Sequence, residues 1–581
     1  MDIWERDGIG GCLGAVRQSM LGNIIQAHTS TLVERMITWG ACMCLFNSFI
    51  MFELETRTMS LIHRSAVREL QEGAPLYGAR MPAHRRCRRA ALGALVTGLA
   101  LAACAVGPNY HKPPVEIPDG FKEGTDWRRA EANPSGALAS TWWTSFQDDT
   151  LDQLIEDSLK ANQSIAAAEA AYRLAKATVD ANVANLYPTI GAGLSASRAS
   201  YGAGASDTGT KVIGNEFVAD LSLSWELDLW GQIRREIESA RAAAEASDAQ
   251  LAGERLSIAS SVALDYFALR QADIDIDLLK QQQDIYQRIL SMTQAELGQG
   301  TASNDDLLVA QDNLELVIAD LQSTEISREQ YEHAIAVLIG KPPEGFSLPP
   351  KPSYTFVQPT IPTGVPSELL ERRYDVVSAE RTAASANARI GVAEAAFYPS
   401  LTLSAEAGFE HSAIQRLFSV PNRFWTVGPS LAETLFDGGA RTAAVREARA
   451  TYDEQVANYR QAVLSAFQTV EDSLSSVTHL AQQEQQFAGI YKNNRQLLTS
   501  EDAQVRAGTA SEQSLLTQKL TLLQAQENLE DTQAALSESE VTLIKNLGGG
   551  WQWDNSRNAP ASAAASSAAP TDDRATGVSS Q

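Results

Sequence analysis

Few side chains in this sequence have the type and spacing that chemistry requires. The four histidines after residue 104 are scattered along the chain, at His111, His333, His411 and His479. They have neither metal-ligand spacing nor a paired nucleophile, and no GxxxxGK phosphate loop occurs. Four of the five cysteines precede Cys104 and none follows it. The sequence therefore predicts no enzyme, no metal site and no downstream disulfide, and it leaves Cys104 as the one candidate for covalent chemistry.

The residues before Cys104 have the parts of a secretory signal peptide. From Met81 the chain reads MPAHRRCRR and then AALGALVTGLALAAC, which is a basic segment, an apolar segment and small residues before the cysteine. The apolar segment is shorter than the ~20 residues that a membrane-spanning helix needs. We therefore expect residues 81–103 to be a signal peptide and residues 1–80 to be an untranslated upstream extension. The alternative is that the apolar run 36–52 is a membrane anchor.

The ending Leu101-Ala102-Ala103-Cys104 resembles the bacterial lipobox. In a lipobox the cysteine thiol receives a diacylglycerol, and its new amino group is acylated after cleavage. The resemblance implies that Cys104 carries a covalent lipid, with no other cofactor, and that residues 104–148 form a lipidated N-terminal segment. Ala105 stands where an aspartate is the usual inner-membrane retention signal, which implies delivery to the outer membrane. The alternative is an ordinary signal peptide with a chance cysteine.

The charge of the chain also divides at Cys104. Residues 1–103 hold 11 arginines and no lysine against 8 acidic residues, a net charge of +3. The rest holds 36 basic and 63 acidic residues, a net charge of −27. Nucleic-acid binding requires a basic face, so we expect no nucleic-acid partner.

The chain after Cys104 contains two copies of one unit. LGQGTAS at 297–303 recurs as VRAGTAS at 505–511, and LYP recurs as FYP two hundred or so residues later. We predict a first repeat over 149–340, a proline-rich linker over 341–365 and a second repeat over 366–550. The Ala/Ser-rich tail 554–581 is expected to be disordered.

Long helices are the first element that each repeat predicts. The segments 232–298 and 440–506 contain no proline and little glycine, and a helix of that length would reach roughly 100 Å. Gly300 and Gly508 follow these segments, so that a second helix can run back. In the second returning segment leucine recurs every seven residues from Leu515 to Leu543, which is typical of a coiled-coil seam.

Amphipathic strands are the second predicted element. Apolar and polar residues alternate in FVADLSLSWELDLW (217–230) and LTLSAEAGF (401–409), and more weakly over 189–197 and 425–435. A tilted strand of ~9–11 residues crosses a bilayer, and apolar-out with polar-in is the membrane-barrel pattern. Because bacterial barrels need at least eight strands, several chains would have to share one barrel. The alternative is a soluble sandwich with one wet face.

The order of these motifs resembles the TolC-like outer membrane efflux family, in its NodT-type lipoprotein branch. The resemblance rests on the lipobox, AVGPNYHKPPVEIP, the duplicated helix–LYP/FYP–strand–helix–GTAS unit and LIKNLGGGW, and it covers about 105–553. It implies a mostly α-helical fold with a transmembrane β-barrel contribution. Four strands per chain would form a twelve-stranded barrel in a homotrimer, continued by a helical tunnel through the periplasm.

The resemblance also implies a function and partners. Such proteins are passive exit ducts of tripartite efflux pumps, which dock to a periplasmic adaptor protein and an inner-membrane RND-type transporter and export drugs or other small molecules. They carry out no catalysis. A duct of a type I protein secretion system is a close alternative, and a structural coiled-coil envelope lipoprotein without a pore is a different one. The net charge of −27 suggests a lumen that favours cations.

Finally, the resemblance suggests roles for residues at the helix turns. An acid matching Asp306 lies at the constriction in the family, so Asp305 and Asp306 are candidates for a periplasmic gate. Ser514 and Thr517 stand where relatives often place a second pair of aspartates, so we do not expect an intact second acidic ring. Adjacent aspartates near a helix start are alternatively partners of the helix dipole. The adaptor-docking candidates are turn residues, whose plain role would be to end a helix: Gly300, Thr301, Gly508 and Thr509.

Overall fold

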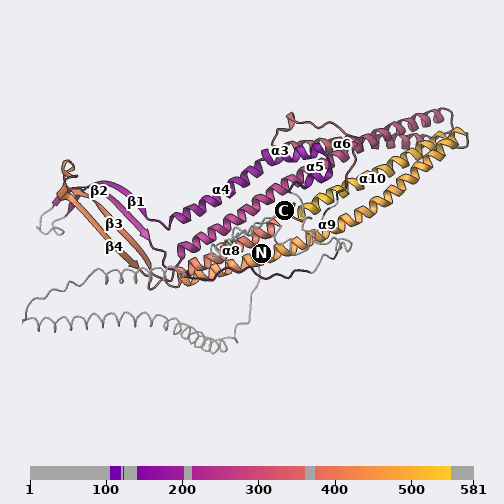
Figure 1. Ribbon diagram of the computed structural model, residues 1–581. Helices are drawn as coiled ribbons and strands as arrows, with labels where there is room; N and C mark the ends of the chain where they lie inside the picture. Colours follow the sequence, from indigo (N-terminus) through magenta and orange to yellow (C-terminus); the bar gives the residue numbers. More distant parts are fainter. Residues whose placement is uncertain are drawn as a thin grey trace, which may run out of the picture. The chain divides into compact units, whose positions relative to one another are not determined.

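The structure, a computed structural model, describes residues 105–118, 122, 140–201, 212–359, 361 and 373–550. Four predicted features lie outside the described residues: the extension 1–80, the expected signal peptide 81–103, the expected lipid acceptor Cys104 and the tail 554–581. All described residues belong to one compact unit, which is drawn in colour in Figure 1.

Two copies of one helix–strand–helix unit make up this fold. The first copy contains α3 (Asp149–Ala161), α4 (Gln163–Ala184), β1 (Thr189–Tyr201), β2 (Val212–Glu226), α5 (Gln232–Gly298) and α6 (Asn304–Leu338). The second contains α8 (Tyr374–Ala395), β3 (Ser400–His411), β4 (Arg423–Ala432), α9 (Ala440–Arg506) and α10 (Glu512–Asn546). Short 3-10 turns are η3 (Trp142–Phe146), η5 (Pro343–Gly345), η6 (Ile414–Arg416) and η7 (Val420–Asn422). The helices α5 and α9 match the predicted segments, and both have 67 residues.

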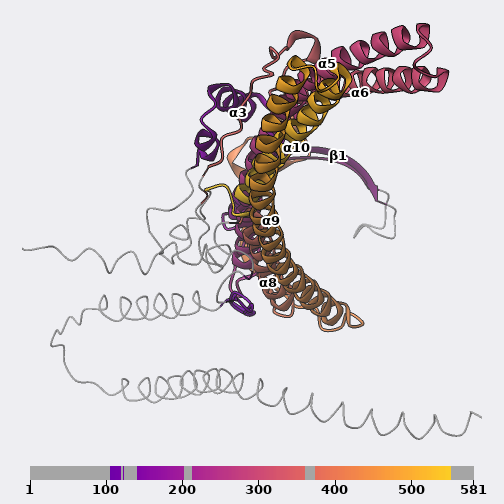
Figure 2. The ribbon, with the colours of Figure 1, turned by 90° about the vertical axis from the view of Figure 1, so that its right-hand side faces the viewer.

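The four strands form one antiparallel sheet in the order β1-β2-β3-β4. The sheet lies at one end of the helices, and the turns from α5 to α6 and from α9 to α10 lie at the other end (Figure 1). Strand β1 bends through an arc (Figure 2). The fold is therefore mostly α-helical with four antiparallel strands, as predicted, and it keeps the sheet far from the helix turns.

Both long helices begin with a left-handed glycine and a nearby aspartate that accepts hydrogen bonds from the first helical amides. Gly231 and Gly439 precede α5 and α9 with φ of 84° and 94°, a left-handed conformation that glycine adopts without a Cβ penalty. In the second copy the Asp437 carboxylate accepts hydrogen bonds from the Gly439 and Arg441 amides at 2.9 and 3.1 Å and from Arg441 Nε at 2.7 Å. The Arg441 guanidinium and these amides lower the pKa of Asp437 to about 2. In the first copy Asp228 accepts from the Arg234 amide and Nε, both at 3.0 Å.

The buried stripe of α10 differs from the predicted leucine seam. Near the turn the structure buries Leu516 and Leu523, whereas the predicted Leu515 and Leu522 are only partly buried. The helix packs against both α9 and α5, so its buried positions come from two stripes. A straight helix also drifts by ~20° per heptad relative to a seven-residue repeat. Leu536 and Leu543 of the predicted seam are nevertheless buried, so the seam holds at the end of the helix away from the turn and shifts by one residue near the turn.

A buried carboxylate joins the first copy to the linker. Asp273 of α5 is completely buried; its Oδ1 accepts from Arg328 Nε of α6 at 2.6 Å. Its Oδ2 accepts from an Arg270 guanidinium nitrogen at 2.7 Å and from the Lys351 amide at 2.9 Å. Charge-assisted hydrogen bonds of this length are about twice as strong as neutral ones. Asp273 thus fixes two helices and the linker at one point.

The same two arginines hold the middle of the linker. Arg328 donates to the Leu348 carbonyl at 2.7 Å, and Arg270 donates to the Pro349 carbonyl at 3.0 Å. Just after this point Tyr354 and Phe356 enter the main hydrophobic core, where their rings meet edge to face at 5.0 Å. The described part of the predicted 341–365 linker is therefore bound to the helices along its length.

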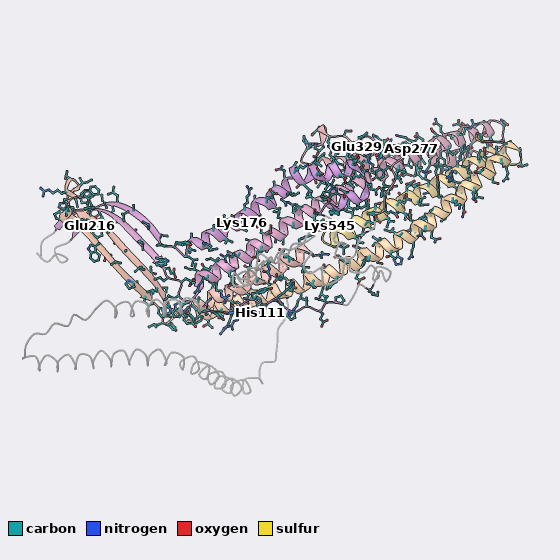
Figure 3. All side chains as sticks on the ribbon, viewed as in Figure 1. His111, Lys176, Glu216, Asp277, Glu329 and Lys545 are labelled. Atoms are coloured by element: carbon teal, nitrogen blue, oxygen red, sulfur yellow. The ribbon has the colours of Figure 1, made fainter. Side chains whose placement is uncertain are left out.

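Replacing Asp273 by alanine tests this anchoring. Asp273→Ala removes the carboxylate that pairs with Arg270 and one of the two carboxylates that pair with Arg328, and removing one partner of a buried ion pair costs about 3–5 kcal/mol. We expect a clearly lower thermal unfolding midpoint for the purified protein in detergent. Asp277→Ala is the matched control, because Asp277 is exposed one turn further along α5 (Figure 3). Equal midpoints for the two variants would contradict the assignment.

Candidate functional site

One face of the sheet is apolar across all four strands. Residues directly opposite each other in an antiparallel sheet share a face, and one such row runs Ile190–Leu223–Ala405–Val427. On β2 this face is apolar from Phe217 to Trp225, about the 9–11 residues of a tilted membrane-crossing strand. Its large side chains are open, for example Ile190 at 73% and Trp425 at 76% exposure. An apolar surface of this extent marks a membrane or protein contact.

The opposite face of the sheet is polar and acidic. A neighbouring row on this face runs Gly191–Ser222–Glu406–Thr426. Among the described strand residues this face has no basic side chain and carries five acids: Glu216, Asp220, Glu226, Glu406 and Glu410. Glu216 lies on the sheet far from the helices (Figure 3). Gly193 and Gly408 flank Asp220, and a Cβ at Gly193 would lie 2.5 Å from its carboxylate. The sheet is thus amphipathic, with its negative charge on one side.

Aromatic side chains gather where the strands join the helices. We call Tyr187, Trp230, Phe397, Tyr398 and Phe436 the aromatic row. Trp230 stacks on Tyr398 with ring centroids 4.8 Å apart, and its Nε1 donates to the Pro399 carbonyl at 2.8 Å. Tyr187 and Phe436 are largely exposed. Exposed aromatic side chains at the edge of an apolar band are typical of the aromatic girdles of membrane proteins. The LYP and FYP motifs were recognised in the sequence as repeats, but this role was missed, although their place before the strands could have indicated it.

Polar residues bound the apolar band at its other end. Arg198, Asn215, His411 and Arg423 continue the same face toward the strand hairpins, where Arg198 pairs with Asn215 and Arg423 pairs with Phe409. The apolar face is therefore limited on both sides, by charged and polar residues at one end and by the aromatic row at the other. Among the described helices, none is both long and apolar enough to cross a membrane.

The two helix turns have the same geometry. Gly300 and Gly508 have φ of 73° and 71°. The Thr301 amide and hydroxyl donate to the Glu296 carbonyl at 2.9 and 3.0 Å, and Thr509 donates to Gln504 at 2.9 and 3.1 Å. These bonds end the helices as a glycine C-terminal motif does. A Cβ at either glycine would meet nothing within 4 Å, so the turns are open to a partner.

The gate candidates of the first copy form a helix start. Asp306 Oδ2 accepts from the Ser303 amide at 2.8 Å and from its hydroxyl at 2.7 Å, and the Asp306 amide donates back to Ser303 Oγ at 3.1 Å. This is a capping box, and the Ser303 amide is the main cause that lowers the pKa of Asp306. Asp305 is exposed beside it. The structure thus displays the helix-terminus role of Asp306, which is compatible with an exposed charge at a gate.

The gate candidates of the second copy have different partners. Ser514 donates its amide to Ser511 Oγ at 3.0 Å, and its hydroxyl contacts Glu501 of α9. Thr517 donates to the Gln513 carbonyl one turn earlier at 2.9 Å, as an ordinary helical threonine does. An acid therefore lies beside Ser514, and it comes from α9 across the helix turn.

Carboxylates crowd the boundary between the two helical hairpins, where α5 meets α10. Gln271 of α5 donates to Asp275 at 2.9 Å and to Asp531 of α10 at 2.7 Å. Burial first, and then the charges of Asp531 and Glu527, raise the pKa of Asp275 to about 7. Burial is also the main cause that raises the pKa of Glu540 to about 8. Below these values the two groups are mostly neutral. Within the described residues no such cluster has the arrangement of a metal site.

Comparison with known sequences identifies relatives over most of the described chain. The family model described as "Outer membrane efflux protein" matches residues 154–341 and 365–549. The chain is 29% identical to "Nodulation protein T" of Rhizobium leguminosarum bv. viciae over 78% of this chain and 91% of that protein. It is 30% identical to "Pyoverdine export outer membrane protein OpmQ" of Pseudomonas putida over 79% of this chain and 97% of that protein.

Solved structures share the fold. The outer-membrane channel OprN superimposes with a TM-score of 0.70 at 29% identity, over 78% of this chain and all of that chain. The CmeC outer membrane channel of Campylobacter jejuni superimposes with a TM-score of 0.71 at 25% identity, over 78% and 97% of the two chains. The amphipathic sheet, the long helices and these matches agree. The chain belongs to the outer membrane efflux protein family, and it is an outer membrane efflux channel.

Proposed function

We propose that three copies of this chain form the exit duct of a tripartite efflux pump. Their sheets would join as a twelve-stranded barrel in the outer membrane, and their helical hairpins would continue it as a periplasmic tunnel. The observation that carries this proposal is the sheet, which has an apolar face, an acidic face and two open edges at β1 and β4. No catalytic role is proposed.

The open edges favour a shared barrel. In a bilayer each unpaired backbone group costs several kcal/mol, so a membrane sheet must close on itself. Four strands are fewer than the eight of the smallest bacterial barrels. Rotational symmetry would let β1 of each chain pair with β4 of the next, and the arc of β1 suits a barrel wall (Figure 2). On the helices, Leu464 and Leu497 of α9 are exposed and suit burial against a neighbouring copy.

Small molecules are the proposed cargo, with an RND-type transporter and a periplasmic adaptor as partners. Relatives of this chain are named for the efflux of toluene and antibiotics and for the export of pyoverdine. The acidic inner face favours cations over anions in transit. A type I protein secretion duct would use the same architecture, so cargo assays in cells distinguish it from the proposed pump. A structural lipoprotein without a pore would have no use for an amphipathic sheet.

A lipid on Cys104 is proposed as the membrane anchor. The signal-like sequence before this cysteine supports it, and so does the position of the next described residue. Ala105 lies against Gly231, beside the aromatic row. The acyl chains would then enter the bilayer at the level of the aromatic side chains.

The assembly is tested by native mass spectrometry of protein extracted from outer membranes. We expect a trimer whose subunits begin at an acylated Cys104. Leu221 lies at the centre of the apolar span, and a basic residue facing the middle of the bilayer costs about 2–4 kcal/mol. Leu221→Arg should therefore remove the trimer from the outer membrane. The matched control is Ser222→Arg, one residue along on the polar face, which should assemble. Equal behaviour of both variants would favour the pore-free lipoprotein.

A gate at Asp305 and Asp306 is proposed for the periplasmic end. Both carboxylates are exposed at the start of α6, next to the turn. Replacing both by asparagine should lower the cation-over-anion permeability ratio of single channels in planar bilayers. Glu329→Gln is the control, because Glu329 is an exposed acid further along the same helix (Figure 3). If the permeability ratio of the double variant is unchanged, the gate is rejected and Asp306 has its capping role alone.

Adaptor docking is proposed at the open turns, formed by Gly300, Thr301, Gly508 and Thr509. The mature chain has no cysteine after Cys104, so Ala507→Cys introduces a unique free thiol. Ala507 is exposed beside Gly508. With a thiol-attached photo-crosslinker, we expect in living cells an adduct that mass spectrometry identifies as the adaptor. Leu435→Cys, at the membrane end, should give none. Adaptor adducts at Leu435 rather than Ala507 would refute docking at the turns.

A further inference from the structure

The segment that follows Cys104 is bound far more tightly than a membrane tether requires. We infer that residues 105–110, which we call the strap, are a rigid spacer that fixes the depth of the anchored N-terminus. Arg235 is the positioning residue that holds the strap in place. This role rests on the proposed lipid at Cys104 and adds to it a defined level in the bilayer. Four contacts of described residues support it.

The first contact places the start of the strap at the root of the sheet. The Val106 amide donates to the Trp230 carbonyl at 3.0 Å. A Cβ on Gly231 would lie 2.8 Å from the Ala105 Cα, so the strap backbone lies directly against the turn from β2 to α5. Because Trp230 belongs to the aromatic row, residue 105 is held at the boundary of the apolar band.

The second contact is a buried guanidinium that binds several strap positions at once. Arg235 is only 5% exposed. Its Nε donates to the Val106 carbonyl at 3.1 Å, and one terminal nitrogen donates to the Gly107 carbonyl at 3.0 Å and to Asn109 Oδ1 at 2.9 Å. The other terminal nitrogen pairs with Glu238 at 2.7 Å. A planar guanidinium has donors in a fixed fork, so it sets the orientation of the strap as well as its position.

The third contact lets the strap backbone approach the second repeat. Gly107 has φ of +95°, and a Cβ on it would lie 2.4 Å from the Gly391 Cα of α8. A Cβ on Gly391 would in turn lie 2.9 Å from the Val106 carbonyl oxygen. These two facing glycines therefore leave no room for a side chain between the strap and α8.

The fourth contact ties the rest of the strap to α8. Asn387 donates to the Pro108 carbonyl at 3.0 Å, and the Tyr110 hydroxyl donates to Glu380 at 2.6 Å. Arg235 belongs to α5 of the first copy, whereas these partners belong to the second. A flexible leader of this length would let the acyl group change its depth in the bilayer. A strap that is bound from both sides prevents this movement.

Hydrogen exchange and label depth test the inference together in the full-length protein in lipid nanodiscs. Ala105→Cys places a spin label at the start of the strap, and intact mass reports the lipid on Cys104. In the otherwise wild-type chain we expect slow exchange of the Val106 amide, which is hydrogen-bonded to the Trp230 carbonyl, and one label depth. In Arg235→Gln exchange should be at least about tenfold faster, because three hydrogen bonds to a charged donor are lost, and the label depth should spread. Lipid mass and trimer mass should match those of Arg255→Gln, the control on the surface of the same helix.

A second variant pair covers the case in which Arg235→Gln does not fold. Gly391→Ala inserts a methyl group into the strap contact, whereas Gly489→Ala places one where nothing lies within 4 Å. Only the first should release the strap. Fast exchange in the wild-type strap, or a lower melting midpoint with unchanged label depth, would overturn the positioning role while leaving the lipid anchor intact. Slow exchange in the strap of a protein that carries no lipid on Cys104 would overturn the proposed anchor. The strap would then have no acyl group to position.

Discussion

The outer edges of β1 and β4 impose the constraint on which the rest of the structure depends. Within the described chain neither edge pairs with another strand, and the apolar face of the sheet has no second layer to cover it. The order of the sheet therefore comes from its register and from its attachment to the helices. Trp230 stacked on Tyr398, and the capped starts of α5 and α9, provide this attachment. A sheet without its own core is thereby held in a form that suits a lipid environment.

The two repeats share their local devices and differ in their surroundings. Both long helices start from a left-handed glycine beside a capping aspartate, and both end in a glycine–threonine turn. However, α5 buries 26 of its residues in this chain and α9 buries only 7. The linker and the strap both attach to α5, whereas one side of α9 stays open. The two repeats thus contain long helices of equal length. Of these, α5 forms the core of the chain, whereas α9 faces outward.

Local patterns predicted the elements well, and distant contacts could not be predicted. The bounds of α5 and α9 followed from uninterrupted segments limited by glycine, and the strands followed from strict alternation. The alternation of β2 continues to Trp230, although the strand ends at Glu226 because Asp228 and Gly231 start the next helix. The strap contacts of Arg235 join positions that are more than a hundred residues apart. No local signal in either segment indicates that they meet.

The uninterrupted length of α5 has a mechanical consequence. Its 67 residues make a rod of about 100 Å, and a rigid rod of this length acts as a lever. A tilt of about one degree at the membrane end displaces the far end by about 1.7 Å, if the rod keeps its length of ~1.5 Å per residue. Gly231 and Gly300 stand at its two ends, where backbone angles change most easily. A disturbance too small to break any contact at the root of the sheet would therefore arrive at the helix turn as a shift comparable to the hydrogen-to-oxygen distance of a hydrogen bond.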